Sequence, residues 1–281
     1  MSRKKKNTLL FAAALALAVT VAIGLPLWLI LGRTAENETG RETRTAADGY
    51  TSSDFYMQDG FLRYGAGEHM VGIDVSVHQG LIDWQAVADS GVEFAVIRAG
   101  LRGATLGALY EDEQFRYNLR EAKAAGLKVG VYFFSQAKDE AEAREEAEYV
   151  CKLLDGEKLE LPVYYDWEVV DESSRVTSPS DVDLTACTLA FCENVEANGY
   201  RAGVYFNQTI GYLHLDLEKT AQYSLWLAEY SDAPTFPVKF RCLQFSDSGT
   251  VAGIVGNVDL DLWISEETNE VTVNEIESES E

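Results

Sequence analysis

The chain has 281 residues, of which 47% are hydrophobic and 11% aromatic, enough to bury a large core and too much for a disordered protein. Its formal net charge is -23 at pH 7, and the acidity is concentrated after residue 70, where 39 acidic side chains accompany 15 basic ones. Because proteins bind nucleic-acid phosphates through Lys and Arg, this balance argues against nucleic acid as a partner.

The first two segments differ from the rest of the chain. Residues 1–7 form a short basic end, and residues 8–32 form an uncharged run rich in Leu, Ala and Val. As a helix this run exceeds the bilayer core of about 30 Å, whereas the apolar part of a cleaved signal peptide has only about 7 to 15 residues. We therefore predict an uncleaved transmembrane signal anchor, with a cleaved signal peptide as the alternative. The basic end predicts a cytoplasmic amino terminus, and hence a single-pass protein of the cell membrane with its remaining chain outside the cytoplasm.

Two polar segments flank the central part of the chain. Residues 33–69 are rich in Thr, Glu, Gly and Ser, which predicts a flexible linker. Residues 266–281 carry seven acids and no base, which predicts a disordered, solvated tail. The four cysteines show no metal-type spacing, so we expect buried thiols, although a bridge involving Cys151 or Cys242 stays open.

Between these segments, apolar β-branched runs alternate with helical patterns. The expected strands are 71–76, 93–100, 127–135, 161–168, 201–207, 223–230, 239–246 and 256–263. The expected helices are 83–90, 110–125, 139–154, 180–198 and 208–219. Alternating strands and helices predict a parallel sheet, and eight strands in this length predict a closed α/β barrel that resembles a TIM barrel without its last helices, (β/α)5(β)3, over residues 70–265.

Four acids occur inside apolar strands. Asp166 and Glu168 lie two residues apart in PVYYDWEVV, and alternation along a strand places them on one face. Asp74 ends the first strand and Asp259 lies in the last, which we expect to close against the first. A barrel would bring all four to one mouth, where functional groups of such barrels are found. A capping or surface role accounts for any one of them, but unpaired buried charge is too costly for it to account for all four.

Carboxylate clusters either bind hard cations or divide acid and base roles in glycoside cleavage. Aromatic and amide side chains that suit sugar rings occur near the same strand ends. They are Tyr132, Phe134, Tyr164, Tyr205, Trp226, Tyr230 and Gln244. Each aromatic ring alone would equally serve as barrel core, so the set indicates a sugar site only together with the acids.

These residues lie in segments that resemble glycoside hydrolase family 25 in matching order over about residues 70–265. The segments are GIDVSVHQGLIDW, GVYFFS, YYDWE, GVYFN, LWLAEY, LQFSDSG and GNVDLDLW. The family comprises bacterial and phage-type lysozymes, N-acetylmuramidases that cut the β-1,4 bond between N-acetylmuramic acid and N-acetylglucosamine in peptidoglycan. The resemblance implies a flattened barrel of five βα units followed by three strands, with no metal or organic cofactor.

By position, the resemblance implies that Glu168 is the proton donor and Asp166 its partner carboxylate, with Asp74 and Asp259 completing the set. It favours assistance by the substrate's own N-acetyl group over a covalent or an inverting route, which the spacing of the acids leaves open. After D-V-S the family often has His or Tyr followed by Trp or His, whereas this chain has Val77 and His78, and His78 is a candidate substrate contact. The alternative is a membrane-tethered peptidoglycan-binding module with little turnover. The expected partners are peptidoglycan strands and, through residues 8–32, the membrane, and we presume a monomer.

Overall fold

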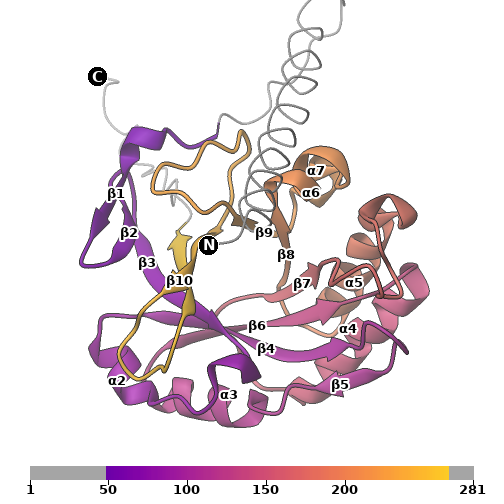
Figure 1. Ribbon diagram of the computed structural model, residues 1–281, viewed down its shortest axis with the longest axis horizontal. Coiled ribbons are helices and arrows are strands. Elements are labelled where there is room, and N and C mark those ends of the chain that lie inside the picture. Colours follow the sequence, from indigo (N-terminus) through magenta and orange to yellow (C-terminus); the bar gives the residue numbers. More distant parts are fainter. Residues whose placement is uncertain (1–48, 266–281) are drawn as a thin grey trace, which may run out of the picture. The chain divides into compact units, whose positions relative to one another are not determined.

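The structure, a computed structural model, describes residues 49–265, and eight of its strands close into a barrel (Figure 1). The neighbours follow the order β3-β11-β10-β9-β8-β7-β6-β4, and the pairing of β3 with β4 closes the circle. The barrel strands are β3 (His69–Val75), β4 (Phe94–Arg102), β6 (Lys128–Ser135), β7 (Val163–Trp167), β8 (Ala202–Asn207), β9 (Ser224–Ala228), β10 (Cys242–Gly249) and β11 (Val258–Ile264). All eight strands expected from the sequence are confirmed.

The sheet is mixed, which corrects the expectation of a parallel one. Seven strands run parallel to one another, but β11 is antiparallel to both of its neighbours, β10 and β3. A parallel connection needs a crossover of a dozen or more residues, and residues 250–257 between β10 and β11 are too few for one. The last strand therefore enters the barrel in the reverse direction.

Helices follow the first five barrel strands and are absent after β9 and β10 within residues 49–265. The α-helices are α2 (Trp84–Asp89), α3 (Phe115–Ala124), α4 (Glu140–Leu154), α5 (Leu184–Ala197), α6 (Gln208–Leu213) and α7 (Leu217–Thr220). Short polar residues fix their starts: the Asp139 side chain, for example, accepts a hydrogen bond from the Glu142 N–H at 3.0 Å. The expected helix 110–125 starts only at Phe115, because β5 (Leu109–Glu111) pairs with the end of β4.

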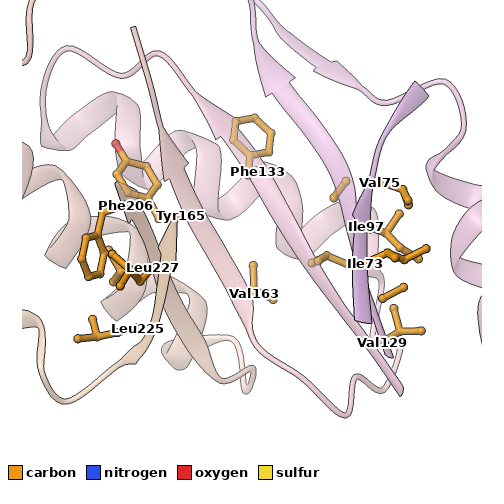
Figure 2. Packing of buried hydrophobic residues seen from close by; sticks show 14 of the residues in the cluster. Ile73, Val75, Ile97, Val129, Phe133, Val163, Tyr165, Phe206, Leu225 and Leu227 are labelled. Carbon is orange, nitrogen blue, oxygen red and sulfur yellow. The ribbon is translucent and has the colours of Figure 1, made fainter. Parts of the chain in front are cut away.

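Alternation along each strand divides the core into two layers. The outward-facing side chains pack between the sheet and the helices, as Figure 2 shows for Ile73, Ile97 and Val129 and for a second group around Tyr165 and Phe206. These five side chains are at most 2% exposed. The helices thereby hold the strands in place from outside, which leaves the inward faces free to form a site.

The barrel interior is filled by a separate aromatic cluster around Trp226. The Trp226 ring lies 5.0 Å from the Tyr164 ring and 4.7 Å from the Tyr205 ring, measured between centroids. Two glycines admit the large rings: a Cβ at Gly72 would overlap Phe94, and one at Gly203 would overlap Tyr164. These rings fill one end of the barrel, and the cleft opens at the other end.

The predicted linker is wrong for residues 49–69, which are folded. A short 3-10 helix, η1 (Ser52–Asp54), leads into the antiparallel hairpin of β1 (Phe55–Gln58) and β2 (Phe61–Tyr64). Phe55, Phe61 and Leu62 are buried in the main core, and the Tyr50 hydroxyl donates to the Phe240 carbonyl at 2.7 Å. Burial of these apolar side chains stabilises the folded segment, although most of its other residues are polar.

Other sequence predictions concern residues outside this part of the chain. The basic end 1–7, the anchor 8–32 and the tail 266–281 lie outside the described residues. No helix among residues 49–265 has the length and apolar character needed to cross a bilayer.

All four cysteines are free thiols; Cys187, Cys192 and Cys242 are buried and Cys151 is partly buried.

Candidate active site

The structure brings the four predicted acids to one mouth of the barrel. Asp166 lies near the carboxyl end of β7, Glu168 follows that strand directly, and Asp74 is the penultimate residue of β3. Asp259 pairs with Asp74 in the β11–β3 register. Because β11 is antiparallel, the amino end of β11 lies at the same rim as the carboxyl ends of the other strands.

The mouth opens into a cleft of about 850 Å³ that all four acids line. Seven of the eight predicted substrate contacts also line it. They are Tyr132, Phe134, Tyr205, Trp226, Tyr230, Gln244 and His78. The cleft continues past the acids along β5, where Tyr110 and Leu101 contribute to its wall.

Tyr164 does not line this cleft, so its prediction as a substrate contact is wrong. Its side chain is fully buried and packs against Trp226 inside the barrel, and its hydroxyl is 3.1 Å from the Ser224 hydroxyl. Tyr164 faces inward like Asp166, but it lies two residues earlier on the strand and therefore one layer deeper. Alternation along a strand predicts whether a side chain faces into or out of the barrel, but it does not predict how deep in the barrel the side chain lies.

Asp166 and Glu168 form a pair of neighbouring acids, the first buried and the second partly exposed. Trp167 between them points outward, and its Nε1 donates to the Ala137 carbonyl at 2.9 Å. Burial raises the pKa of Glu168, against a hydrogen bond from Tyr205 that lowers it. Burial, and then the charge of Glu168, raise the pKa of Asp166, which the positive charge of Arg98 opposes. Burial thus favours the protonated form of both acids, and the two neighbouring charges disfavour each other.

The Glu168 backbone is fixed by a buried amide. Gln136, which follows β6 and is fully buried, donates from Nε2 to the Glu168 carbonyl and to the Ser135 carbonyl. Glu168 stands at the start of the irregular connection between β7 and α5, and this contact ties its backbone to the neighbouring strand. The acid is thereby held at the rim in a defined position.

Asp74 is held by a hydrogen-bond network across the mouth. Gln244 of β10 donates from Nε2 to Asp74 Oδ2 at 2.7 Å. Its Oε1 accepts from the Tyr205 hydroxyl at 3.1 Å and from the Tyr230 hydroxyl at 3.2 Å. These contacts fix the orientation of the amide, so that the donor faces the carboxylate.

A fifth acid, Asp261, lies beneath this network and was missed by sequence reasoning. It is fully buried, and its Oδ1 accepts from Trp226 Nε1 at 2.8 Å. Burial raises its pKa to about 8 and raises the pKa of Asp74 well above its usual range, and the two carboxyls share a hydrogen bond. Burial, followed by the charge of Asp247, raises the pKa of Asp259 to about 6. The alternation that revealed Asp166 and Glu168 recurs in VDLD and could have found Asp261.

An ion pair in the wall was also missed. Arg98 of β4 donates from Nε to Asp112 Oδ2 at 2.8 Å, and both side chains are at least nine-tenths buried and line the cleft. Asp112 also accepts from the Val77 N–H at 3.0 Å and the Gln114 N–H at 2.9 Å. The signal available in the sequence was a single arginine inside the apolar run EFAVIRAG.

Residues 49–265 contain no group of three or more His, Cys, Asp or Glu side chains arranged to hold a metal ion. The acids of the mouth instead contact an amide, hydroxyls, an indole N–H and one another.

A closed barrel with two coupled acids at the end of one strand, in an aromatic-lined cleft, is the arrangement of a glycoside hydrolase. The chain belongs to glycosyl hydrolases family 25, whose model matches residues 73–254. This match covers Asp74, Asp166 and Glu168, whereas Asp259 and Asp261 lie just beyond it.

Two curated proteins similar to this chain are named as lysozymes. The chain is 34% identical over 199 residues to an autolytic lysozyme of Clostridium acetobutylicum, covering 68% of this chain and 55% of the relative. It is 28% identical over 201 residues to lysozyme M1 of Streptomyces globisporus, covering 67% of this chain and 65% of the relative. The chain thus spans between half and two thirds of these curated relatives.

Among solved structures, the modular autolysin LytC of Streptococcus pneumoniae superposes with a TM-score of 0.63 at 26% identity, covering 74% of this chain and 52% of the autolysin. That autolysin has also been solved with a synthetic peptidoglycan ligand. The bacterial lysozyme of Streptomyces coelicolor superposes with a TM-score of 0.57 at 25% identity, covering 70% of this chain and 91% of the lysozyme.

Proposed function

We propose that this protein is a muramidase that hydrolyses the β-1,4 bond between N-acetylmuramic acid and N-acetylglucosamine in peptidoglycan. The observation that carries the proposal is the meeting of Asp74, Asp166, Glu168 and Asp259 at one mouth of the barrel, in a cleft with aromatic walls. Family membership and the names of the relatives support the choice of peptidoglycan.

Glu168 is the general acid in this proposal. Its raised pKa favours the protonated form, and it is the more exposed member of the pair, so it can reach a glycosidic oxygen in the cleft. Protonation of that oxygen lets the leaving sugar depart as an alcohol. General acid catalysis of this kind supplies about a hundred- to ten-thousand-fold in rate.

Asp166 acts on the other side of the reaction. Ionised, it stabilises the positive charge that develops on the sugar ring, or it orients the substrate's N-acetyl group while the carbonyl oxygen of that group attacks the anomeric carbon. Its side chain lines the cleft beside Glu168, which places the carboxyl next to a bound sugar. The second route agrees with the neighbouring-group assistance that the family resemblance implies.

Asp74, Asp259 and Gln244 organise the mouth. Gln244 links Asp74 to the hydroxyls of Tyr205 and Tyr230, and the Tyr205 hydroxyl is also hydrogen-bonded to Glu168. A displacement of Asp74 would therefore be transmitted to Glu168 through three hydrogen bonds. The exposed ring of Tyr230 offers an apolar face on which a sugar can stack.

The test is mass analysis of the fragments that the full-length protein releases from purified peptidoglycan. The muramidase produces fragments with reducing N-acetylmuramic acid ends, and Glu168→Gln loses activity by at least about a hundredfold while it keeps its folded spectrum. Glu172→Gln, an exposed position on the same connection, is the matched control and retains activity. An active Glu168→Gln variant would remove Glu168 from its role, and binding without release by the wild type would favour the peptidoglycan-binding module.

We also propose that residues 8–32 anchor the enzyme in the cell membrane with the barrel on the outer side. The support is the charge and apolar pattern of residues 1–32 alone. A tethered muramidase would remodel nearby wall and would not lyse distant cells. Fractionation of cells that express the protein tests this: the wild type should stay with membranes, whereas a form that lacks residues 1–32 and carries a cleavable export signal should be released.

A further inference from the structure

The connection between β7 and α5 begins with Glu168 and is anchored again at Arg175. Between the two, Val170 and residues 171–173 are exposed. Val176, the residue after Arg175, is buried in the main core. The chain thus leaves the barrel at Glu168 and returns to it at Arg175.

Arg175 contacts three other segments at this point of return. Its guanidinium bridges both carboxylate oxygens of Glu142 on α4, with Nη1 donating to Oε2 at 2.9 Å and Nη2 to Oε1 at 2.7 Å. The Arg175 backbone N–H donates to the Ala104 carbonyl at 2.6 Å, in the turn between β4 and β5. Nη1 also donates to the Gln136 carbonyl at 3.4 Å. A planar guanidinium that bridges a carboxylate has one defined orientation, so Arg175 fixes these segments relative to one another.

Gln136 joins the two anchors of the connection. Its side-chain amide donates to the Glu168 carbonyl, and its own carbonyl accepts from Arg175. The exposed segment 169–174 is therefore held at both ends on the same buried residue. Arg175 is not among the residues that line the cleft, so its effect on a bound substrate passes through the connection.

A glycine provides the space for the guanidinium. Gly107, in the turn between β4 and β5, has a φ of +71°, and a Cβ there would lie 2.5 Å from Arg175 Nη1. The Gly107 carbonyl accepts from Arg102 Nη1 at 2.8 Å, and Arg102 Nη2 donates to the Glu142 carbonyl at 3.0 Å. The turn, α4 and the connection are thus held together by two arginines, and any side chain at Gly107 would displace one of them.

We infer that Arg175, seated on Glu142 and Gly107, is a positioning residue that holds Glu168 at the rim of the cleft. The inference deepens the proposed function and rests on it for its catalytic meaning. If Arg175 is removed, the connection loses its second anchor, and Glu168 samples positions farther from the bond to be cut. A small misplacement of an acid lowers the rate of the chemical step far more than it weakens substrate binding.

Steady-state kinetics on purified peptidoglycan give the first measurement. In the full-length protein, Arg175→Gln should lower kcat by about ten- to a hundredfold and change KM by less than about threefold. Arg144→Gln, which removes an exposed arginine of α4 that pairs with Glu140, is the matched control and should keep wild-type kcat. A kcat for Arg175→Gln within about twofold of the wild type overturns the inference.

A titration of Glu168 gives a second measurement that needs no activity. Full-length Asp166→Asn, in which Glu168 titrates without its neighbour, is labelled with 13C at the glutamate carboxyl carbons, and the Glu168 signal is assigned by its loss in Glu168→Gln. Burial is the main cause of the raised pKa of Glu168, so a displaced Glu168 should titrate at lower pH. Adding Arg175→Gln should lower the midpoint by about half a pH unit, although loss of a positive charge by itself raises a carboxyl pKa.

Gly107→Ala tests the same contact with every charge retained. It should lower both kcat and the Glu168 midpoint, in the direction of Arg175→Gln, and it serves as the test if Arg175→Gln does not fold. Gly126→Ala is its control, because Gly126 has a φ of +86° but a Cβ there would meet no atom within 4 Å. Equal effects of the two alanines would mean that backbone strain alone is responsible, and this would overturn the inference.

The failure of this inference is distinguishable from the failure of the proposed function. If the wild type cleaves no peptidoglycan, the Glu168 midpoint still decides whether Arg175 holds the acid in place. A midpoint that rises, or that stays within about 0.1 unit of its parent in Arg175→Gln, overturns the inference whatever the activity of the protein.

Discussion

Asp261 should make the stability of the fold depend on pH. The unfolded chain releases the Asp261 proton near the ordinary aspartate value of 3.8, whereas the buried group in the folded chain holds it up to about pH 8. Between these values the folded state binds more protons than the unfolded state, so stability falls as the pH rises. Each pH unit is worth about 1.4 kcal/mol, which gives an upper bound of about 4 kcal/mol between pH 5 and pH 8.

Because Asp74 and Asp259 take part in the same titration, we expect Asp261 alone to account for about half of this amount, roughly 2 kcal/mol. Asp261→Asn removes the titration. The new amide can still accept from Trp226 Nε1 and can donate to Asp74, so the packing is preserved. The variant should therefore lose less stability than the wild type between pH 5 and pH 8.

Urea unfolding followed by tryptophan fluorescence at pH 5, 6.5 and 8 measures the effect as the change in the free energy of unfolding. Asp232→Asn, on an exposed loop after β9, is the control and should follow the wild type. Equal pH dependence in Asp261→Asn and the wild type would show that the buried carboxyl is ionised at all three pH values, and the reasoning would be refuted.

Three further predictions follow from the site and the core. The pH profile of kcat should be bell-shaped, because activity needs Asp166 ionised and Glu168 protonated. Its midpoints should lie above the ordinary carboxyl range, because burial raises the pKa of both acids. A profile that is flat between pH 4 and 8 would contradict this. Tyr164→Phe should keep wild-type kcat/KM, whereas Tyr205→Phe, which loses its bonds to Gln244 and Glu168, should lower it by roughly tenfold in assays on purified peptidoglycan. Leu62→Ala should lower the free energy of unfolding by about 2 to 5 kcal/mol, because Leu62 is fully buried; a loss below about 0.5 kcal/mol would mean that the β1–β2 hairpin is not part of the core.

The sequence predicted the site well where the chemistry repeats along one strand. Asp166 and Glu168 were assigned to one face by alternation alone, and the closure of the last strand on the first correctly placed Asp259 beside Asp74. These predictions depend on local periodicity and on the requirement that buried charge has a function. Both are properties that a single sequence displays.

What the sequence did not reveal depends on contacts between distant segments. The depth of Tyr164 is set by Gly203 and Trp226 on other strands, and the ion pair of Arg98 with Asp112 forms only because β5 folds back against the end of β4. The β1–β2 hairpin was hidden because three buried side chains are scattered among polar neighbours, and the composition of residues 33–69 as a whole is typical of a linker. The direction of β11 depends on residues 250–257, which are too few for the crossover that a parallel strand needs.

The folded hairpin has a consequence for how far the enzyme could work from a bilayer. With residues from 49 onward packed on the barrel, only residues 33–48 separate the proposed anchor from the folded body. A flexible chain of about 16 residues has a root-mean-square span of roughly 20 to 25 Å, compared with about 30 to 35 Å for the whole of 33–69. With so short a tether, the proposed muramidase would reach only the glycan strands nearest the membrane. The distance between the bilayer and the wall would then determine whether the enzyme can bind its substrate.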